Sequence, residues 1–150
     1  MAGSKRHGES VGDLFNRGID SHREGRIDDA ARAYDEVLRR EPTHAGALNM
    51  RGAVELQRGD AVAALRYFDG ALASDPARAS VHLNRGNALR ALHRRHEALA
   101  SYDRALELDP RMAMAHVNRG NVLRDEGSLS DAATAYCAAL ALDSSSFPAA

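Results

Sequence analysis

Histidine and cysteine are the side chains of this chain best suited to bind a metal or to attack a substrate, and it has seven histidines and one cysteine. His93 and His96, in the segment HRRH, have a spacing that could ligate a metal ion. Arg94 and Arg95 lie between them, however, and their charges oppose a cation. No glycine-rich phosphate loop, paired-cysteine motif or nucleophile in a recognisable setting is present. We therefore predict no catalytic residue, no metal site and no cofactor.

Asparagine is the other residue type whose spacing indicates chemistry, here binding. Asn84 and Asn118 are separated by 34 residues, as are Asn87 and Asn121. A carboxamide offers two donors and an acceptor, so a row of them can bond the backbone of an extended peptide without reading its side chains. The alternative is that these asparagines bond to neighbouring structural units.

The elements that position these residues repeat every 34 residues. The segments HLNRGNALR (82–90) and HVNRGNVLR (116–124) differ at two of nine places. Glycines keep this spacing at Gly18, Gly52, Gly86 and Gly120, and aromatic residues keep it at Tyr34, Phe68, Tyr102 and Tyr136. The whole chain is therefore an array of one structural unit.

Each copy contains two stretches with apolar residues three and four apart, which predicts two helices joined by a turn. The turn carries glycine in three copies and His93 in the third. Gly86 in the first helix and Ala98 in the second allow the two helices to approach closely. His82 and His116 hold equivalent places and are expected to be packed side chains, and Cys137 is expected to be a small core residue.

A 34-residue helix–turn–helix with Gly86, Ala98, Tyr102, Ala105 and a terminal Pro110 resembles the tetratricopeptide repeat over residues 11 to about 146. The resemblance implies an all-α fold, a right-handed superhelical solenoid of four repeats at 11–44, 45–78, 79–112 and 113–146. Residues 1–10 are predicted to be a disordered leader and 147–150 a short tail. The sequences NRGNALR and SYDRALELDP are also similar to those of the repeat arms of protein O-glycosyltransferases.

In this family the first helix of each repeat lines the concave side of the solenoid, so the resemblance places the binding groove there. In the glycosyltransferase arms an asparagine ladder holds substrate peptide, and its phase corresponds to Asn16, Asn84 and Asn118. The predicted peptide-binding residues are Asn16, Asn49, Leu83, Asn84, Asn87, Arg90, Val117, Asn118, Asn121 and Arg124.

Charge and hydropathy narrow the classes of partner. The 20 basic and 21 acidic residues leave a net charge of −1, which gives no global field for nucleic acid or an anionic membrane. No apolar run is long enough to span a membrane. A single cysteine and the polar start MAGSKRHGES favour a cytoplasmic location.

The function these observations favour is a non-catalytic adaptor that holds a peptide or protein segment in its groove. One alternative is an accessory arm that delivers substrate to a glycosyltransferase, and another is a self-assembling scaffold. Binding of chaperone C-termini ranks lower, because the only lysine, Lys5, lies in the predicted leader.

Two further expectations concern contacts between repeats. An arginine directly precedes the glycine that recurs every 34 residues, in all four copies. We predict that this arginine pairs with an aspartate of the preceding copy. The predicted pairs are Asp35 with Arg51, Asp69 with Arg85, and Asp103 with Arg119. The last helix is strongly apolar, and its expected uncovered residues are Ala135, Ala138, Leu142 and Phe147. We predict a two-fold homodimer through that face, with a folded-back tail as the alternative cover.

Overall fold

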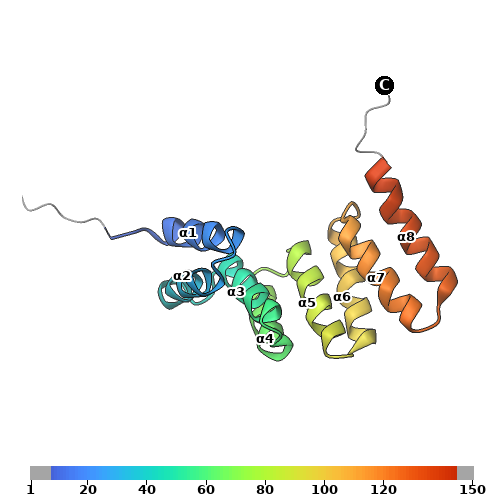
Figure 1. Cartoon of the computed structure of the whole chain (residues 1–150), viewed down its shortest axis with the longest axis horizontal. Helices are drawn as coiled ribbons and strands as arrows, with labels where there is room; N and C mark the ends of the chain where they lie inside the picture. Colours follow the sequence, from blue (N-terminus) through green and yellow to red (C-terminus); the bar gives the residue numbers. More distant parts are fainter. Residues whose placement is uncertain (1–7, 145–150) are drawn as a thin grey trace, which may run out of the picture.

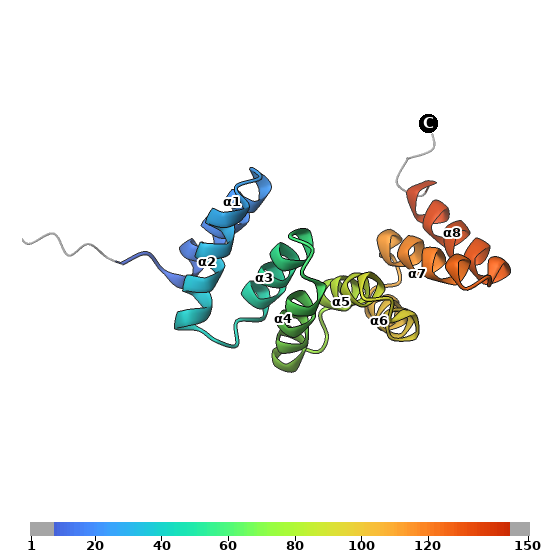
Figure 2. The same ribbon diagram turned by 60° about the horizontal axis from the view of Figure 1, so that its bottom comes forward.

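The computed structural model describes residues 8–144, and within this range the backbone forms eight α-helices and no β-strand. In chain order they are α1 (Val11–Arg23), α2 (Ile27–Arg40), α3 (Ala45–Gln57), α4 (Ala61–Ser74), α5 (Ala79–Ala91), α6 (Arg95–Leu108), α7 (Ala113–Asp125) and α8 (Leu129–Ser144). Each odd-numbered helix packs most extensively on the even-numbered helix that follows it. Figures 1 and 2 show four such hairpins following one another along an extended array, which confirms the predicted all-α helical-repeat fold. Of the predicted leader only residues 8–10 are described, and the predicted tail lies outside the described range.

A residue with left-handed backbone closes the first helix of every hairpin. The residue that follows it donates its N–H to a carbonyl five positions earlier, as Arg94 does to Leu89 at 2.9 Å. This bond defines the Schellman ending, which favours glycine because the left-handed region crowds a Cβ. The four residues and their φ angles are Gly25 at 77°, Gly59 at 86°, His93 at 59° and Gly127 at 81°.

The repeated glycine of each first helix lies against the repeated aromatic ring of the second helix. A Cβ built on that glycine would approach a ring carbon more closely than real contacts allow, so any other residue would force the ring to shift. The closest approach would be 2.5 Å at Gly18, 2.6 Å at Gly52, 2.5 Å at Gly86 and 2.7 Å at Gly120. The predicted steric reason for glycine at this phase is therefore confirmed.

A ladder of ion pairs connects successive repeats, as predicted. The arginine Nε lies 2.8 Å from the carboxylate in Arg51–Asp35, 2.7 Å in Arg85–Asp69 and 2.6 Å in Arg119–Asp103. In the first repeat, where no described helix precedes α1, Arg17 pairs with Glu9 at 3.0 Å. Because the aspartates are half exposed, each pair is worth at most about 1 kcal/mol and serves mainly to fix register.

Apolar clusters cross each seam between successive repeats. Leu38 packs beside Val37 and Ala47, and Leu72 packs beside Phe68 and Val81, so this position of each second helix meets the first helix of the next repeat. No described helix follows α8, and there the equivalent Leu140 is 67 % exposed.

The expectations for five residues at the C-terminal end are corrected by the structure or fall outside the described residues. Ala135 is buried rather than uncovered, because it faces α7 within the hairpin. Cys137 is exposed rather than a core residue, since it occupies the phase of the seam aspartates, whose side chains point toward the next repeat. Ala138 and Leu142 are partly buried, and Phe147 lies outside the described residues.

Candidate functional site

The inner side of the array is formed by the odd-numbered helices. α3 contacts α5 and α5 contacts α7 directly, whereas within residues 8–144 no comparably extensive contact joins two even-numbered helices. The array therefore curves with α3, α5 and α7 on its shorter side. We call the predicted binding residues on these three helices the inner face; they are Asn49, Leu83, Asn84, Asn87, Arg90, Val117, Asn118, Asn121 and Arg124.

Hydrogen bonds between asparagines connect the inner face from one repeat to the next. Asn84 Nδ2 donates to Asn49 Oδ1 at 3.0 Å, and Asn118 Nδ2 donates to Asn87 Oδ1 at 2.8 Å. Asn118 is buried, whereas the other three are partly exposed. These contacts are the ones expected of the alternative in which asparagines bond to neighbouring repeats. Asn16, at the same phase, is exposed on α1, the first described helix.

A second set of bonds fixes the orientation of two carboxamides. The Tyr102 hydroxyl donates to Asn87 Oδ1 and the Tyr136 hydroxyl donates to Asn121 Oδ1, each at 2.8 Å. Burial raises the pKa of Tyr102 to about 12, so its phenol stays protonated and remains a donor at neutral pH. These bonds were not predicted from the sequence, although a signal for them is present. In the third and fourth repeats, where the tyrosine hydroxyl has a partner, an asparagine lies fifteen residues before the tyrosine. The first and second repeats have no asparagine at that position.

The first repeat lacks this partner. Ile19 takes the place of Asn87 there, and the buried Tyr34 hydroxyl has no hydrogen-bond partner among the described residues. Nδ1 of His22 is likewise buried without a partner, while its Nε2 donates to Gln57 Oε1 at 3.2 Å. The two rings lie 6.4 Å apart between centroids. The N-terminal end of the inner side therefore lacks the tyrosine–asparagine bond that the third and fourth repeats contain.

The basic residues of the inner face are exposed at its C-terminal end. Arg124 Nη2 lies 3.2 Å from Asp125 Oδ1, whereas Arg90 forms no ion pair with any described residue. Arg90, His93 and Arg95 come together around one pocket, so His93 is placed beside arginines rather than beside metal ligands. Within residues 8–144 no group of three or more histidine, cysteine, aspartate or glutamate side chains is arranged to hold a metal ion.

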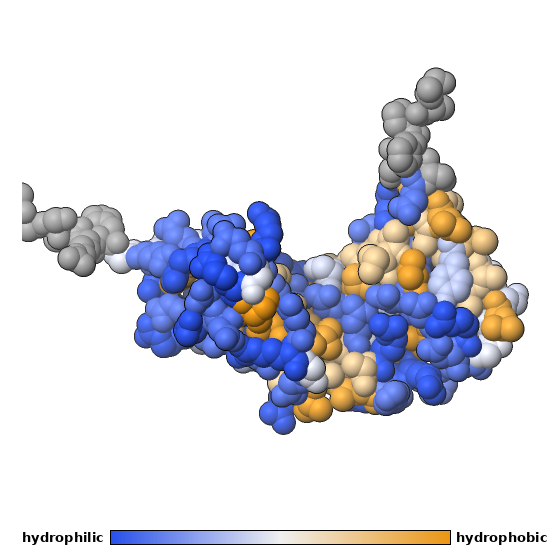
Figure 3. All heavy atoms as spheres, in the orientation of Figure 1, coloured by the Kyte–Doolittle hydropathy of each residue, from blue (hydrophilic) through white to orange (hydrophobic). Residues whose placement is uncertain are grey.

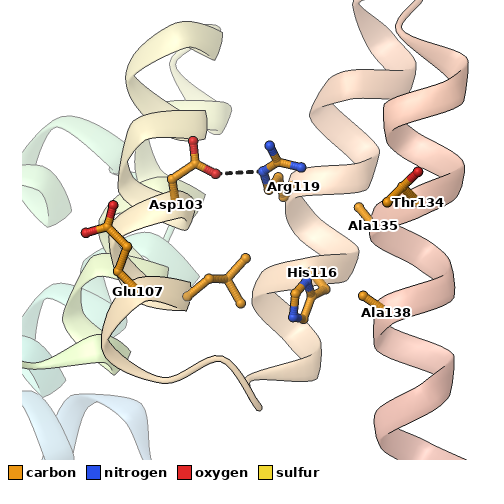
Figure 4. Close-up of a pocket in the computed structure, with 8 residues that line it drawn as sticks. Asp103, Glu107, His116, Arg119, Thr134, Ala135 and Ala138 are labelled. Atoms are coloured by element: carbon orange, nitrogen blue, oxygen red, sulfur yellow. Dashed lines mark hydrogen bonds and ion pairs between the residues drawn. The ribbon is translucent and has the colours of Figure 1, made fainter.

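A larger pocket, about 590 Å³, lies between α6, α7 and α8 (Figure 4). The Asp103–Arg119 pair crosses it, and His116 and Ala138 line it. His116 Nε2 donates to the Pro110 carbonyl at 3.0 Å, and the equivalent His82 donates to Pro76 at 2.9 Å. Both histidines are partly buried, and their rings bond the turn between repeats.

A family model for the tetratricopeptide repeat matches residues 5–79 and 83–147. The chain belongs to the tetratricopeptide repeat family. Such repeats are typically non-catalytic modules of protein–protein interaction, and the fold described above supports that general role here. Among residues 8–144, no helix has the length and hydropathy required to cross a membrane.

Solved structures of other tetratricopeptide repeat proteins superpose closely on this chain. MamA aligns with a TM-score of 0.84 at 18 % identity, covering 95 % of this chain and 83 % of MamA. An O-GlcNAc transferase mutant from Thermobaculum terrenum aligns at 0.74 and 30 % identity, covering 75 % of this chain but only 22 % of the enzyme. The first repeat domain of Spaghetti (RPAP3), bound to an HSP90 peptide, aligns at 0.75 and 21 % identity, covering 78 % and 93 %. No curated protein matches the sequence.

Proposed function

We propose that the protein is an adaptor that binds an extended segment of a partner protein on its inner face. The observation that carries the proposal is the row of carboxamides held at fixed positions on α3, α5 and α7. A carboxamide has two N–H donors and an acceptor oxygen, and Asn84 uses one donor in its bond to Asn49. Its remaining capacity suits the N–H and C=O groups of an extended peptide. The Spaghetti domain, which was solved with a bound peptide, supports this use of the fold.

The contacts of the asparagines decide which of them can test the proposal. Asn87 accepts hydrogen bonds from Tyr102 and Asn118, and Asn121 accepts one from Tyr136. Replacing Asn87 would leave the buried Tyr102 and Asn118 groups without their acceptor, at a cost of about 1–3 kcal/mol, and replacing Asn121 would remove the acceptor of the partly buried Tyr136 hydroxyl. A variant that lacks Asn84, Asn87, Asn118 and Asn121 is therefore expected to lose stability as well as binding. Asn84 is the better probe because its only described partner is the partly exposed Asn49.

The test uses displayed random peptides selected on the intact protein, followed by affinity measurement with a selected peptide. Asn84→Ala should weaken binding about tenfold, corresponding to the loss of about 1.4 kcal/mol of hydrogen bonding, with little change in melting temperature. Thr134→Ala, an exposed polar truncation on α8, is the control and should bind as the intact protein does. Equal affinities for the Asn84 variant and the intact protein would refute peptide binding at this row. Asn16→Ala then measures whether the site reaches the first repeat.

A second proposal concerns the open end of the array, where a second copy of the chain would cover α7 and α8. Met114, Leu129 and Leu140 are 60 %, 66 % and 67 % exposed. Met114 and Leu140 also line a pocket of about 440 Å³ that is otherwise mostly apolar. Figure 3 places hydrophobic and weakly hydrophobic residues over the α8 end, whereas the α1 end is mostly hydrophilic.

The opposite end of the array argues for two-fold pairing rather than head-to-tail stacking. Asp13 stands where later repeats bury Ala47, Val81 and Ala115, and Asp20 stands where they bury residues such as Val54. Stacking α1 on α8 would remove both carboxylates from water against a helix that has no lysine or arginine, with only Ser10 bonded to Asp13 and Arg23 3.9 Å from Asp20, which is costly. Two α8 faces related by a two-fold axis would instead bury apolar surface on both sides.

Light scattering over a concentration series tests the dimer. The intact chain should double in mass as concentration rises, and Leu140→Glu should keep it monomeric. Val62→Glu is the matched control, because Val62 is 52 % exposed on α4, away from the open end. A monomer at every concentration would exclude the dimer.

A further inference from the structure

The turn between α5 and α6 and the end of α7 enclose a pocket of about 300 Å³ that differs from the rest of the array. Its lining comprises Asn87, Arg90, Ala91, His93, Arg95 and Asp125. Arg90 and Arg95 are exposed, and Asn87 is partly buried. The pocket therefore opens to solvent and combines two guanidinium groups, an imidazole and a carboxamide.

The same three positions in the other repeats do not carry this combination. Where the third repeat has Arg90, His93 and Arg95, the other repeats have the following residues: His22, Gly25 and Ile27 in the first, Leu56, Gly59 and Ala61 in the second, and Arg124, Gly127 and Leu129 in the fourth. His93 also keeps the left-handed φ of 59° that the others achieve with glycine, a conformation uncommon for residues with a side chain. The cationic cluster is thus a property of the third repeat and not of the fold.

The arginines of the pocket are available for a ligand. Most arginines in residues 8–144 form ion pairs, and those that form neither an ion pair nor a side-chain hydrogen bond with a described residue are Arg66, Arg90, Arg95 and Arg111. Two of these four line this one pocket. Its carboxylate, Asp125, accepts from Nε of Arg124 at 3.3 Å and from Nη2 at 3.2 Å.

The hydrogen bonds that Asn87 already makes decide whether it can donate to a ligand or accept from one. Its Oδ1 accepts from the Tyr102 hydroxyl and from Asn118 Nδ2, both at 2.8 Å. With the oxygen engaged, the Nδ2 group is the end of the carboxamide left to act on a ligand, and it can only donate. Guanidinium groups are donors as well, and the imidazole of His93 has an N–H that can donate. Apart from Asp125, the polar side chains of the pocket thus present donors and positive charge.

We propose that this pocket binds an oxyanion, either a carboxylate or a phosphate, carried by the partner segment that the inner face holds; the proposal rests on the proposed function for its peptide context. Arg90 and Arg95 supply forked N–H donors that match the geometry of carboxylate and phosphate oxygens. Asn87 and His93 complete the donor set. The pocket thereby selects an acidic or phosphorylated residue at one position of the bound segment, whereas the asparagines bind the backbone of that segment whatever its side chains.

The first experiment probes the pocket without a peptide. Inorganic phosphate is titrated into the isotope-labelled protein, and the side-chain Nε–Hε resonances of the arginines are followed by NMR. Saturable shifts at Arg90 and Arg95, with none at Arg66 and Arg111, are expected. Small, non-saturating shifts of equal size at all four arginines would overturn the pocket, whatever the outcome of the peptide selection.

The second experiment identifies the source of the oxyanion. Three labelled decapeptides alternate serine with glutamate, glutamine or phosphoserine, and fluorescence anisotropy measures their binding to the intact chain. The anionic peptides should bind about tenfold or more tightly than the glutamine peptide, as expected for one or two charge-assisted contacts. The tighter of the glutamate and phosphoserine peptides identifies the ligand group as carboxylate or phosphate.

Two double variants with the same change in charge separate a site from general attraction. R90Q/R95Q should remove the preference for anionic peptides, and R66Q/R111Q, which alters the other two unpaired arginines, should retain it. Equal effects of the two variants, or equal affinities of all three peptides for the intact chain, would overturn the oxyanion pocket. Binding of the glutamine peptide that is lost in Asn84→Ala would in that case still support the peptide-binding face.

Discussion

The two ends of the array are built from the same 34-residue unit but present opposite surfaces. At α1 the seam positions carry Asp13 and Asp20, and Arg17 pairs with Glu9 instead of with an aspartate of a preceding repeat. At α8 the seam positions carry exposed Leu140 and Cys137. An internal repeat packs against a neighbour on both sides and therefore needs two apolar surfaces. A terminal capping repeat has polar residues in place of apolar ones on its outer surface. By this criterion α1 presents a polar outer seam, whereas within residues 8–144 the outer seam of α8 is apolar.

The largest loss of stability should come from placing an acidic residue, as found on the outer surface of α1, at a buried contact between two repeats. Val54→Asp places at an internal seam the residue type that Asp20 provides at the end, but Val54 is fully buried beside Tyr34. An unpaired carboxylate there should lower the free energy of unfolding by about 3–5 kcal/mol. Urea denaturation followed by circular dichroism measures the loss. The reverse change, Asp20→Val on the exposed end, should alter stability by no more than about 0.5 kcal/mol; equal effects of the two changes would contradict the difference between seam and end.

A smaller effect should follow from filling the glycine contacts. Gly52→Ala would place a Cβ 2.6 Å from the Phe68 ring, which is fully buried and has no room to shift, so we expect a loss of about 1–3 kcal/mol. Gly120→Ala meets Tyr136, which is only partly buried in the last hairpin. Its ring can move, and alanine favours the helix by about 1 kcal/mol over glycine, so the loss should be smaller. Melting temperatures that fall equally would show that the last hairpin packs as rigidly as the interior.

The tyrosine hydroxyls should separate the first repeat from the third. Tyr102→Phe removes the donor to Asn87 and should cost about 0.5–1.5 kcal/mol. Tyr34→Phe removes a buried hydroxyl that has no described partner, so stability should hold or rise. A comparable loss in both variants would indicate that Tyr34 has a partner such as a buried water.

The same tyrosines predict how stability depends on alkaline pH. Burial raises the pKa of both Tyr34 and Tyr102 to about 12 from an ordinary value of 10.0. The folded state therefore binds these protons more tightly than the unfolded state does. Their contribution to stability is complete below pH 10 and is lost as pH rises toward 12. The Tyr34→Phe/Tyr102→Phe double variant should lose less stability over that interval in denaturation curves recorded at several pH values.

The smallest effect should come from the ion-pair ladder. Asp69→Ala breaks the pair with Arg85 at an exposed site and should cost no more than about 1 kcal/mol, less in high salt. Asp35→Ala should cost more than Asp69→Ala, because the Arg51 side chain is only 12 % exposed and would lose one of its two acidic partners. A double-mutant cycle for each pair, at low and high salt, measures the difference.

The repeat period was sufficient to predict the fold and the seam contacts. Glycine, alanine and aromatic residues at one spacing fix a helical hairpin by sterics alone, and the Asp–Arg spacing fixes which repeat meets which. The candidate site was less accessible. The sequence placed Asn87 and Asn121 on the inner face, but not their bonds to tyrosine, because such bonds depend on side-chain reach across a hairpin. The pocket at Arg95 was missed because its residues come from a turn and from two neighbouring repeats.

The ion-pair ladder also determines how an array of this kind can grow. A copy of residues 79–112 inserted beside the original would meet its neighbours through an aspartate on one side and an arginine on the other, so every seam would keep its pair. A copy appended after α8 would face Cys137, and its arginine would lack a carboxylate. Internal duplication thus preserves the register of the array, whereas terminal addition does not. The near identity of residues 82–90 and 116–124 is the trace that duplication within the array would leave.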